Sequence, residues 1–419
     1  MNRIGLWSLL LLLSVSSAQA ANTYYVATSG SNSNLGTQAA PFRDINRGIQ
    51  ALSSGDTLYV RGGTYNEQIS SPVNARIPSG TPQQPTTIAG YPGETAILTR
   101  ETRVQDGFDS VPVSYVLFTN FTVRAPCSGP FDNGFSFGGT THHVRVTESD
   151  ITACTGVVIA NSTDHIEIAS NLIHDAPAPF TSAYGMYING NHMLIENNHI
   201  YNNSGYAIHL YSSGANNVSD NVIRGNIIYG NCFDDGVRNQ ALNAVIISSG
   251  SNNYFYNNIL YNNNCLGGGP AITAAYYNGG GNNYIYNNTV YNNNGGGIEI
   301  NTTAPNTTVQ NNIAYNNGSR DIVDLGASGT VLSNNLTTDP SFEDAGAANF
   351  KLKAGSAARD MGIAISVVQT DKDGVVRPQG AAYDIGAYEY VDSSCAVRGG
   401  PNPTLKPRAA NCLQHIIKQ

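Results

Sequence analysis

The sequence predicts an all-β protein whose chain winds into a parallel β-helix. The first observation is a repeat: NNYFYNNILYNNN at 252–264 returns as NNYIYNNTVYNNN at 282–294, with ten of thirteen positions identical. The second is the alternation of apolar and polar residues over three to five positions, which indicates short strands rather than helices. The third is the frequent Asn-Asn pair between these strands, which predicts a turn.

The Asn pairs give the repetition a mechanical cause. Asn tolerates left-handed backbone conformations, and its amide can bond to the same group one coil above and below. Such a column forms only if coils stack in register at strand spacing, about 4.8 Å. We therefore expect units of about 22 to 33 residues around a core of stacked Ile, Val and Leu. The clearest copies lie at 195–213, 223–231, 256–264, 286–301 and 309–325.

The first 20 residues predict export. Arg3, the apolar run 4–15 and the A-x-A-like site Ala18-Gln19-Ala20 form the three parts of a secretory signal peptide. We expect cleavage near Ala20 and a secreted, periplasmic or cell-surface protein. No later segment approaches the roughly 20 apolar residues of a membrane span.

The mature chain divides into four predicted parts. Residues 21–114 form an N-terminal cap and the first coils, and residues 115–345 form the repeats with a candidate cleft. Residues 346–390 form a C-terminal closing segment, and residues 391–419 form a tail closed by a disulfide. Within the cap, one helical face would carry Phe42, Ile45, Ile49 and Leu52.

Six cysteines in an exported chain favour disulfides, although six allow fifteen connectivities. Cys127 and Cys154 occupy similar places in neighbouring repeats, as do Cys232 and Cys265. The repeat register therefore favours these two pairs, and Cys395 would pair with Cys412 in the tail.

The low content of Lys and Arg argues against a nucleic acid partner. Charged residues make up 12% of the chain, the net charge is −8, and no Lys precedes Lys351. Because nucleic acid binding depends on clustered Lys and Arg, we expect no nucleic acid partner. We expect a monomer.

Three parts of the chain resemble a known family. Residues 23–67, from TYYVATSG to GGTYNE, resemble the opening of secreted right-handed parallel β-helix proteins related to pectate lyases. The YNN repeats resemble those of polysaccharide lyases, uronan C5-epimerases and some glycosidases. Residues 350–362 and 371–390 resemble the closing segment of bacterial β-helix proteins. The resemblance implies a right-handed β-helix, a helix over its first coil and a polysaccharide partner.

The third strands of successive coils predict a surface on which functional residues gather. Because side chains alternate along a strand, the third residue of each points outward. The predicted outward column is Ser136, Val158, Tyr187, His209, Ile246, Thr273 and Glu299. Asn189 and Tyr211 lie two places on from this column, and Tyr184 and Tyr206 three places back. Stacked tyrosines suit a sugar ring, whose apolar face packs on an aromatic.

Loop lengths predict a cleft around the same coils. The short link 201–206 lies between two long loops, 174–184 and 232–243. Insertions in repeat proteins usually map to a binding face. We therefore expect His209 on the floor of a cleft, with the long loops as its walls.

The residues of this cleft suit proton abstraction beside a uronate carboxylate. His209 or His174 would be the base, Tyr187 or Tyr211 the acid, and Arg238 the partner of the carboxylate. Ca²⁺ held by Asp175, Asp234 or Asp235 could replace or assist the arginine. The expected substrate-binding residues are Tyr184, Tyr206, Asn189 and Asn239.

Two alternatives to a lyase or epimerase stay open. A glycoside hydrolase could use Asp175, Asp234 and Asp235 as acid and base. A non-catalytic β-helix could serve as a surface or carbohydrate-binding protein. The chain also departs from the resembling families: a lysine base is excluded from the repeats, and the polygalacturonase Gly-His-Gly and Arg-Ile-Lys motifs are missing.

Overall fold

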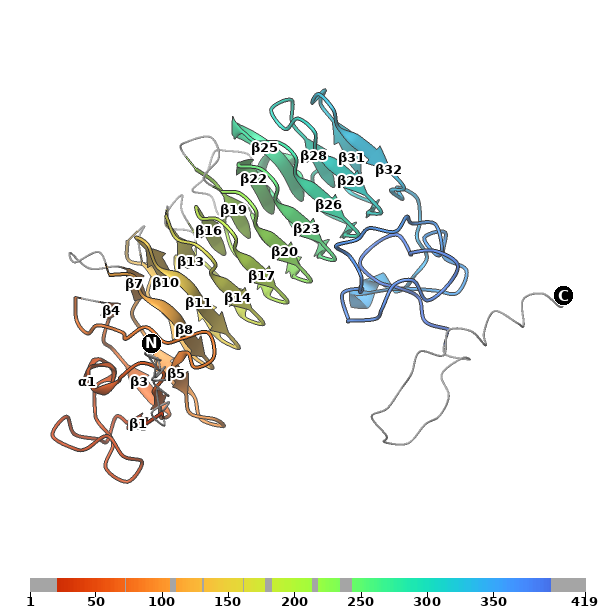
Figure 1. The fold of residues 1–419 in the computed structure, drawn as a ribbon. Helices are drawn as coiled ribbons and strands as arrows, with labels where there is room; N and C mark the ends of the chain where they lie inside the picture. Colours follow the sequence, from red (N-terminus) through yellow and green to blue (C-terminus); the bar gives the residue numbers. More distant parts are fainter. Residues whose placement is uncertain are drawn as a thin grey trace, which may run out of the picture.

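The chain forms a long stack of coils whose strands build three parallel sheets along one axis (Figure 1). The computed structural model describes residues 21–392, except 72, 106–110, 130–131, 161, 178–182, 213–217 and 234–242, and except the side chains of 275–278. The predicted parallel β-helix is confirmed.

Each sheet takes one strand from each successive coil, so neighbouring strands are parallel. In the described part of the chain, sheet A consists of β1 (Thr23–Val26), β2 (Thr57–Val60), β5 (Thr86–Gly90), β8 (Ser114–Thr119), β11 (His142–Thr147), β14 (Glu167–Ala169), β17 (Leu194–Glu196), β20 (Val222–Arg224), β23 (Tyr254–Tyr256), β26 (Tyr284–Tyr286), β29 (Thr308–Gln310) and β32 (Val331–Ser333). Sheet B consists, over the same described ranges, of β3 (Gly63–Tyr65), β6 (Ala96–Leu98), β9 (Thr122–Arg124), β12 (Asp150–Thr152), β15 (Leu172–His174), β18 (His199–Tyr201), β21 (Ile227–Tyr229), β24 (Ile259–Tyr261), β27 (Thr289–Tyr291) and β30 (Ile313–Tyr315).

Sheet C is formed by the third strand of each coil. Its described strands are β4 (Ile69–Ser71), β7 (Thr102–Gln105), β10 (Asn133–Gly138), β13 (Thr155–Ile159), β16 (Met186–Ile188), β19 (Ile208–Leu210), β22 (Val245–Ser249), β25 (Ile272–Gly279), β28 (Ile298–Ile300) and β31 (Ile322–Asp324). The remaining elements are α1 (Ile45–Ala51), the 3₁₀ turns η1 (Leu266–Gly268) and η2 (Ala345–Ala347), and the antiparallel pair β33 (Phe342–Asp344) and β34 (Asn349–Leu352).

Asn ladders hold the turns in register, as the sequence predicts. Between sheets A and B, the side-chain amide of Asn226 donates to the Oδ1 of Asn258 at 2.9 Å, and Asn258 donates to Asn288 at 3.1 Å. These asparagines are fully buried. The preceding residue takes the left-handed conformation, as Asn257 does with φ of 55°. The first Asn of each pair therefore turns the chain from sheet A to sheet B, and the second links this turn to the neighbouring coil.

The N-terminal helix α1 covers the first coil. Ile45 and Ile49 are fully buried, and α1 packs against β1 and β2. Phe42 is buried beside it, and Leu52 is partly buried against the same core. The predicted helix is confirmed, with Ile45 and Ile49 on its buried face, but Phe42 and Leu52 lie outside its bounds and pack beside it.

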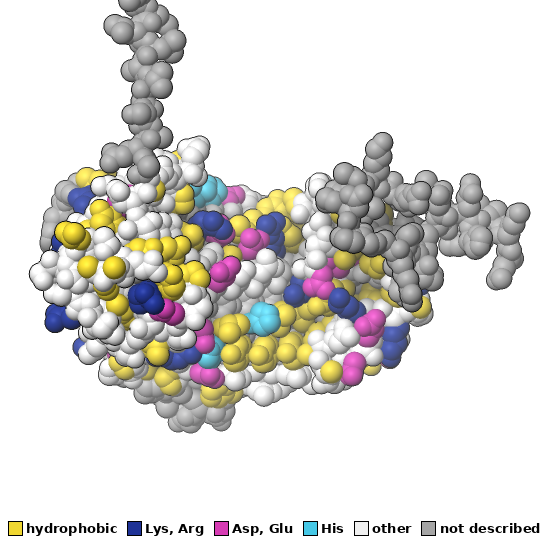
Figure 2. Space-filling model, turned by 90° about the horizontal axis from the view of Figure 1, so that it is seen from below, with side chains coloured by type: hydrophobic (Ala, Val, Ile, Leu, Met, Phe, Trp, Pro, Cys, Tyr) yellow, Lys and Arg dark blue, Asp and Glu magenta, His cyan; other side chains and the backbone are white. Residues whose placement is uncertain are grey.

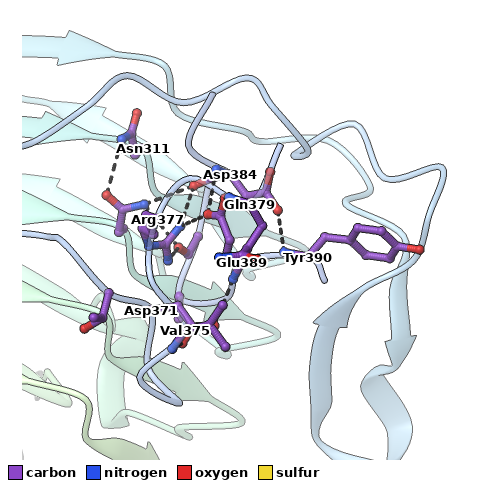
Figure 3. A network of polar contacts seen from close by, with 12 residues as sticks. Asn311, Asp371, Val375, Arg377, Gln379, Asp384, Glu389 and Tyr390 are labelled. Carbon is purple, nitrogen blue, oxygen red and sulfur yellow. Dashed lines mark hydrogen bonds and ion pairs between the residues drawn. The ribbon is translucent and has the colours of Figure 1, made fainter. Parts of the chain in front are cut away.

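Residues 334–392 lie along the outside of the last coils (Figure 1). Figure 3 shows Arg377 at the centre of this segment, where it contacts Glu389 at 2.9 Å and donates to the carbonyl oxygen of Asp384. Both members of this ion pair are fully buried. The backbone amide of Gly386 donates to the carbonyl oxygen of Asn311, which joins the segment to the Asn turns.

Two predicted disulfides are confirmed, Cys127–Cys154 and Cys232–Cys265. The predicted pair Cys395–Cys412 and the signal peptide 1–20 lie outside the described residues. Over the part of the chain that the structure describes, there is no helix with the length and hydrophobicity needed to cross a membrane.

Outward side chains also form columns. The rings of His174, Tyr201, Tyr229 and Tyr261 stack along sheet B, with centroids 4.7, 5.0 and 5.0 Å apart. Figure 2 shows one face of the molecule, on which hydrophobic side chains run lengthwise over the middle coils and histidines lie beside them. Stacking in register therefore brings side chains together that are far apart in sequence.

Candidate functional site

The strands of sheet C pair in the register that was predicted from the third strands of successive coils. Tyr187 pairs with Val158 on one side and with His209 on the other, and His209 pairs with Ile246. The residues on either side of His209, Ile208 and Leu210, are fully buried in the core. His209 therefore points away from the core, on the outer face of the sheet.

Four tyrosines surround the His209 ring. The ring centroids of Tyr206, Tyr187, Tyr211 and Tyr184 lie 4.7, 5.3, 5.3 and 5.7 Å from that of His209. Tyr187 meets the imidazole edge to face, with an interplanar angle of 89°. The structure thus brings together five of the residues predicted for the site.

His209 is more buried than a cleft floor would require, since only 8% of it is exposed. Its Nε2 lies 3.0 Å from the hydroxyl of Ser248. Its Nδ1 is buried and has no hydrogen-bond partner among the described residues. Ser248, which fixes one side of the ring, was not foreseen from the sequence, because it comes from the next coil.

The protonation states of this cluster follow from burial. Burial lowers the pKa of His209 to about 4, so the imidazole is neutral at neutral pH. Burial, assisted by the neighbouring Tyr211 and Tyr184, raises the pKa of Tyr187 to about 12. The cluster therefore pairs a neutral imidazole with a tyrosine that keeps its proton.

Asn189 continues the same strand beyond Ile188. Its backbone amide donates to the carbonyl oxygen of Ile159 at 2.8 Å, which extends the ladder of sheet C. Its side-chain Oδ1 is buried without a partner among the described residues. This amide therefore has an acceptor without a partner two residues beyond Tyr187, and a hydroxyl could use it only after the covering side chains move.

His174 belongs to sheet B, where it ends β15. Its Nε2 lies 2.8 Å from Asp150 and its Nδ1 lies 2.7 Å from Asp175. Asp150 also binds Arg124 through two hydrogen bonds of 2.8 Å. Sequence reasoning missed Asp150, on the neighbouring strand β12, and Arg124, on β9 one strand further along sheet B.

Several predicted residues have no described position. Asp234, Asp235, Arg238 and Asn239 lie in the segment 234–242, outside the described residues. Of the three predicted Ca²⁺ ligands, Asp175 is described, and its side chain is 55% exposed. A carboxylate with this exposure could contribute one oxygen to Ca²⁺, which needs six to eight.

The family to which the sequence matches has the same β-helix fold as the structure. Residues 24–335 match the family described as Pel9A-like, right handed beta helix region, so the chain belongs to this family of right-handed parallel β-helix proteins. The crystal structure of pectate lyase Pel9A superimposes with a TM-score of 0.65 at 17% identity, over 88% of this chain and 97% of that one. At this identity the likeness shows a shared fold.

Two curated proteins match shorter stretches. Pectate lyase PEL9 of Emericella nidulans is 34% identical over 77 residues, which are 18% of this chain and 18% of that protein. The uncharacterized protein YwoF of Bacillus subtilis is 27% identical over 149 residues, 36% of this chain and 28% of that protein. The matches therefore span less than a third of either relative.

Proposed function

We propose that the protein is an exported lyase or C5-epimerase that acts on a uronate-containing polysaccharide at the sheet C face around His209. The observation that carries the proposal is a neutral imidazole with an unpaired, buried Nδ1, enclosed by four tyrosines on one outward face. Membership of a pectate-lyase-like family supports it, as do two disulfides, which fit an oxidising compartment.

The proposed chemistry begins with His209. When Nε2 donates its hydrogen to the Ser248 hydroxyl, Nδ1 carries a lone pair and can accept a proton. The base removes the proton from C5 of the uronate, beside the carboxylate. No Lys occurs before Lys351, so the coils offer no lysine for this step.

Tyr187 would serve as the acid, with Tyr211 as the alternative. In a lyase the bond between C4 and its glycosidic oxygen breaks, a C4–C5 double bond forms, and the tyrosine protonates the leaving oxygen. In an epimerase the carbanion instead takes a proton at C5 from the opposite face. A tyrosine with a pKa of about 12 remains protonated for either role.

The carboxylate of the substrate needs a positive partner, because the described cluster is neutral. We propose Arg238 for this role, or Ca²⁺ bound by Asp175, Asp234 and Asp235. Tyr184, Tyr206, Asn189 and Asn239 would bind the sugar rings and hydroxyls. Because Nδ1 is buried, the proposal requires a tyrosine ring to turn aside when the sugar enters.

A panel of polyuronates tests the proposal, in the presence of Ca²⁺ and of a chelator. A lyase gives rising ultraviolet absorbance from the unsaturated product, and an epimerase changes the uronate NMR signals without chain cleavage. New reducing ends without that absorbance would replace the proposal with a hydrolase. Binding to the polysaccharide without any product would replace it with a carbohydrate-binding β-helix.

A further inference from the structure

A second group of side chains gathers on a different edge of the β-helix, where the strands of sheet A begin. There Tyr115, His143, His165 and His192 occupy the same position in four successive coils, with φ of 54°, 52°, 50° and 54°. The strand registers that follow them place these residues one above another. In the next coils the same column continues as Asp220, Asn252, Asn282 and Asn306.

The histidines of this column are stacked. The rings of His143 and His165 are 4.6 Å apart with an angle of 4°, and those of His165 and His192 are 4.8 Å apart with an angle of 16°. Asn fills the same left-handed position in the later coils, so the fold does not require imidazoles here. The three histidines need another explanation.

Asp164 joins two of these rings. Its Oδ1 lies 2.8 Å from Nδ1 of His192, and its Oδ2 lies 3.0 Å from Nδ1 of His165. One ligand atom from each of the three side chains lies within 4.8 Å of the others. The side chains of Asp164, His165 and His192 are 45, 47 and 49% exposed, so they can adjust and can be reached from solvent.

We propose that Asp164, His165 and His192 bind one divalent transition-metal ion of the zinc and copper class. Two imidazoles and a carboxylate suit such an ion, whereas Ca²⁺ prefers six to eight oxygens. Tetrahedral bonds of about 2.0–2.1 Å place neighbouring ligand atoms roughly 3.3 Å apart, so the exposed side chains need to close by up to about 1.5 Å. The ion would replace the hydrogen bonds to Asp164 and join two successive coils.

The remaining coordination positions would face a groove. His143, His165 and His192 line it together with Tyr115, Pro82 and Leu194. Three protein ligands leave at least one position for water or for a small ligand from this groove. The site is independent of the proposed activity at sheet C, so either proposal can fail without the other.

Isothermal titration of the full chain tests this site. The protein is produced without a histidine tag, treated with a chelator, and titrated at pH 7.5 with Zn²⁺, and separately with Ca²⁺ or Mg²⁺. We expect one Zn²⁺ to bind per chain. We expect Ca²⁺ and Mg²⁺ not to bind at Asp164, His165 and His192. Thermal unfolding should shift upward with Zn²⁺, because a ligand that binds the folded chain stabilises it.

His165→Asn and His192→Asn are the decisive variants. Asn occupies the same column in later coils, so both variants should keep the fold, which the unfolding temperature without metal checks. Each should weaken Zn²⁺ binding by about tenfold or more. His199→Asn, on sheet B, should bind Zn²⁺ as the wild type does. Equal binding by wild type and by both column variants, or no Zn²⁺ binding by the wild type, would overturn the proposal.

Discussion

The coils that contain residues 155–249 and those that contain residues 252–317 use the same turns but differ on their outer faces. The buried Asn ladder passes through both regions, from Asn198 and Asn226 to Asn288 and Asn312. On sheet C, however, the first region presents Tyr187 and His209, and the second presents Thr273 and Glu299. The inward and turn positions are constrained by stacking, and the outward positions are where function can differ.

The largest expected effect is on activity, and it tests whether the outward residues of the first region are special. We expect His209→Gln to lower kcat by roughly 10²–10⁴-fold, because the neutral acceptor is lost. Glu299→Gln, three coils further along the same outward column, should keep wild-type kcat. A product assay on the substrate found in the panel measures both. Equal activities in the two variants would place the site elsewhere.

The next effect concerns the turns that both regions share. Asn258 accepts hydrogen bonds from the backbone and side chain of Asn226 and donates to Asn288. Its replacement by Ala leaves buried donors unpaired, so the free energy of unfolding should fall by about 2–4 kcal/mol. Asn264→Ala, at an exposed loop position, should change it by less than about 0.5 kcal/mol. Denaturant unfolding gives both values, and similar losses would contradict the role of the ladder.

A smaller effect on kcat tests whether Tyr187 is the acid in the proposed reaction. Tyr187→Phe removes the hydroxyl but keeps the ring that packs on His209. We expect kcat to fall by roughly 10- to 100-fold, with KM nearly unchanged. Tyr229→Phe, in the stack on sheet B, serves as the control and should not change kcat. If Tyr187→Phe is fully active, Tyr211 or another group is the acid.

The smallest effect is on stability in acid. The pKa of His209 is about 4 in the folded chain, below its ordinary value of 6.5, so the unfolded chain binds more protons between these pH values. The contribution of neutral His209 to stability is therefore present above pH 6.5 and is lost as the pH falls toward 4. At pH 5 this loss amounts to about 2 kcal/mol. His209→Gln should remove this part of the acid sensitivity. Unfolding of both proteins at pH 7 and pH 5 measures the difference, and parallel losses would show that His209 is not buried as neutral imidazole.

The sequence predicts the regular part of the molecule well for a physical reason. Each Asn pair specifies both a left-handed turn and a link to the next coil, so residues such as Asn258 reveal the stacking by themselves. The outward direction of His209 follows from the same register. The fold class, the capping helix and two disulfides could therefore be predicted without a structure.

The contacts of the candidate site depend on neighbouring coils and could not be predicted in the same way. The coil lengths vary, so Asp150 and His174 meet over 24 residues while His209 and Ser248 meet over 39. The burial of His209 depends on the rings of Tyr184 and Tyr206, which sequence alone does not orient. The group of Asp164, His165 and His192 was missed for the same reason, because it forms only when two coils stack.

The most informative experiment is to locate a bound uronate oligosaccharide on the protein. A crystal of the Tyr187→Phe variant with the substrate identified in the panel would show it. We expect a sugar on sheet C, with its C5 about 3 Å from the Nδ1 of His209. A sugar bound along sheet A or sheet B, with the His209 cluster closed, would rule out the proposed site.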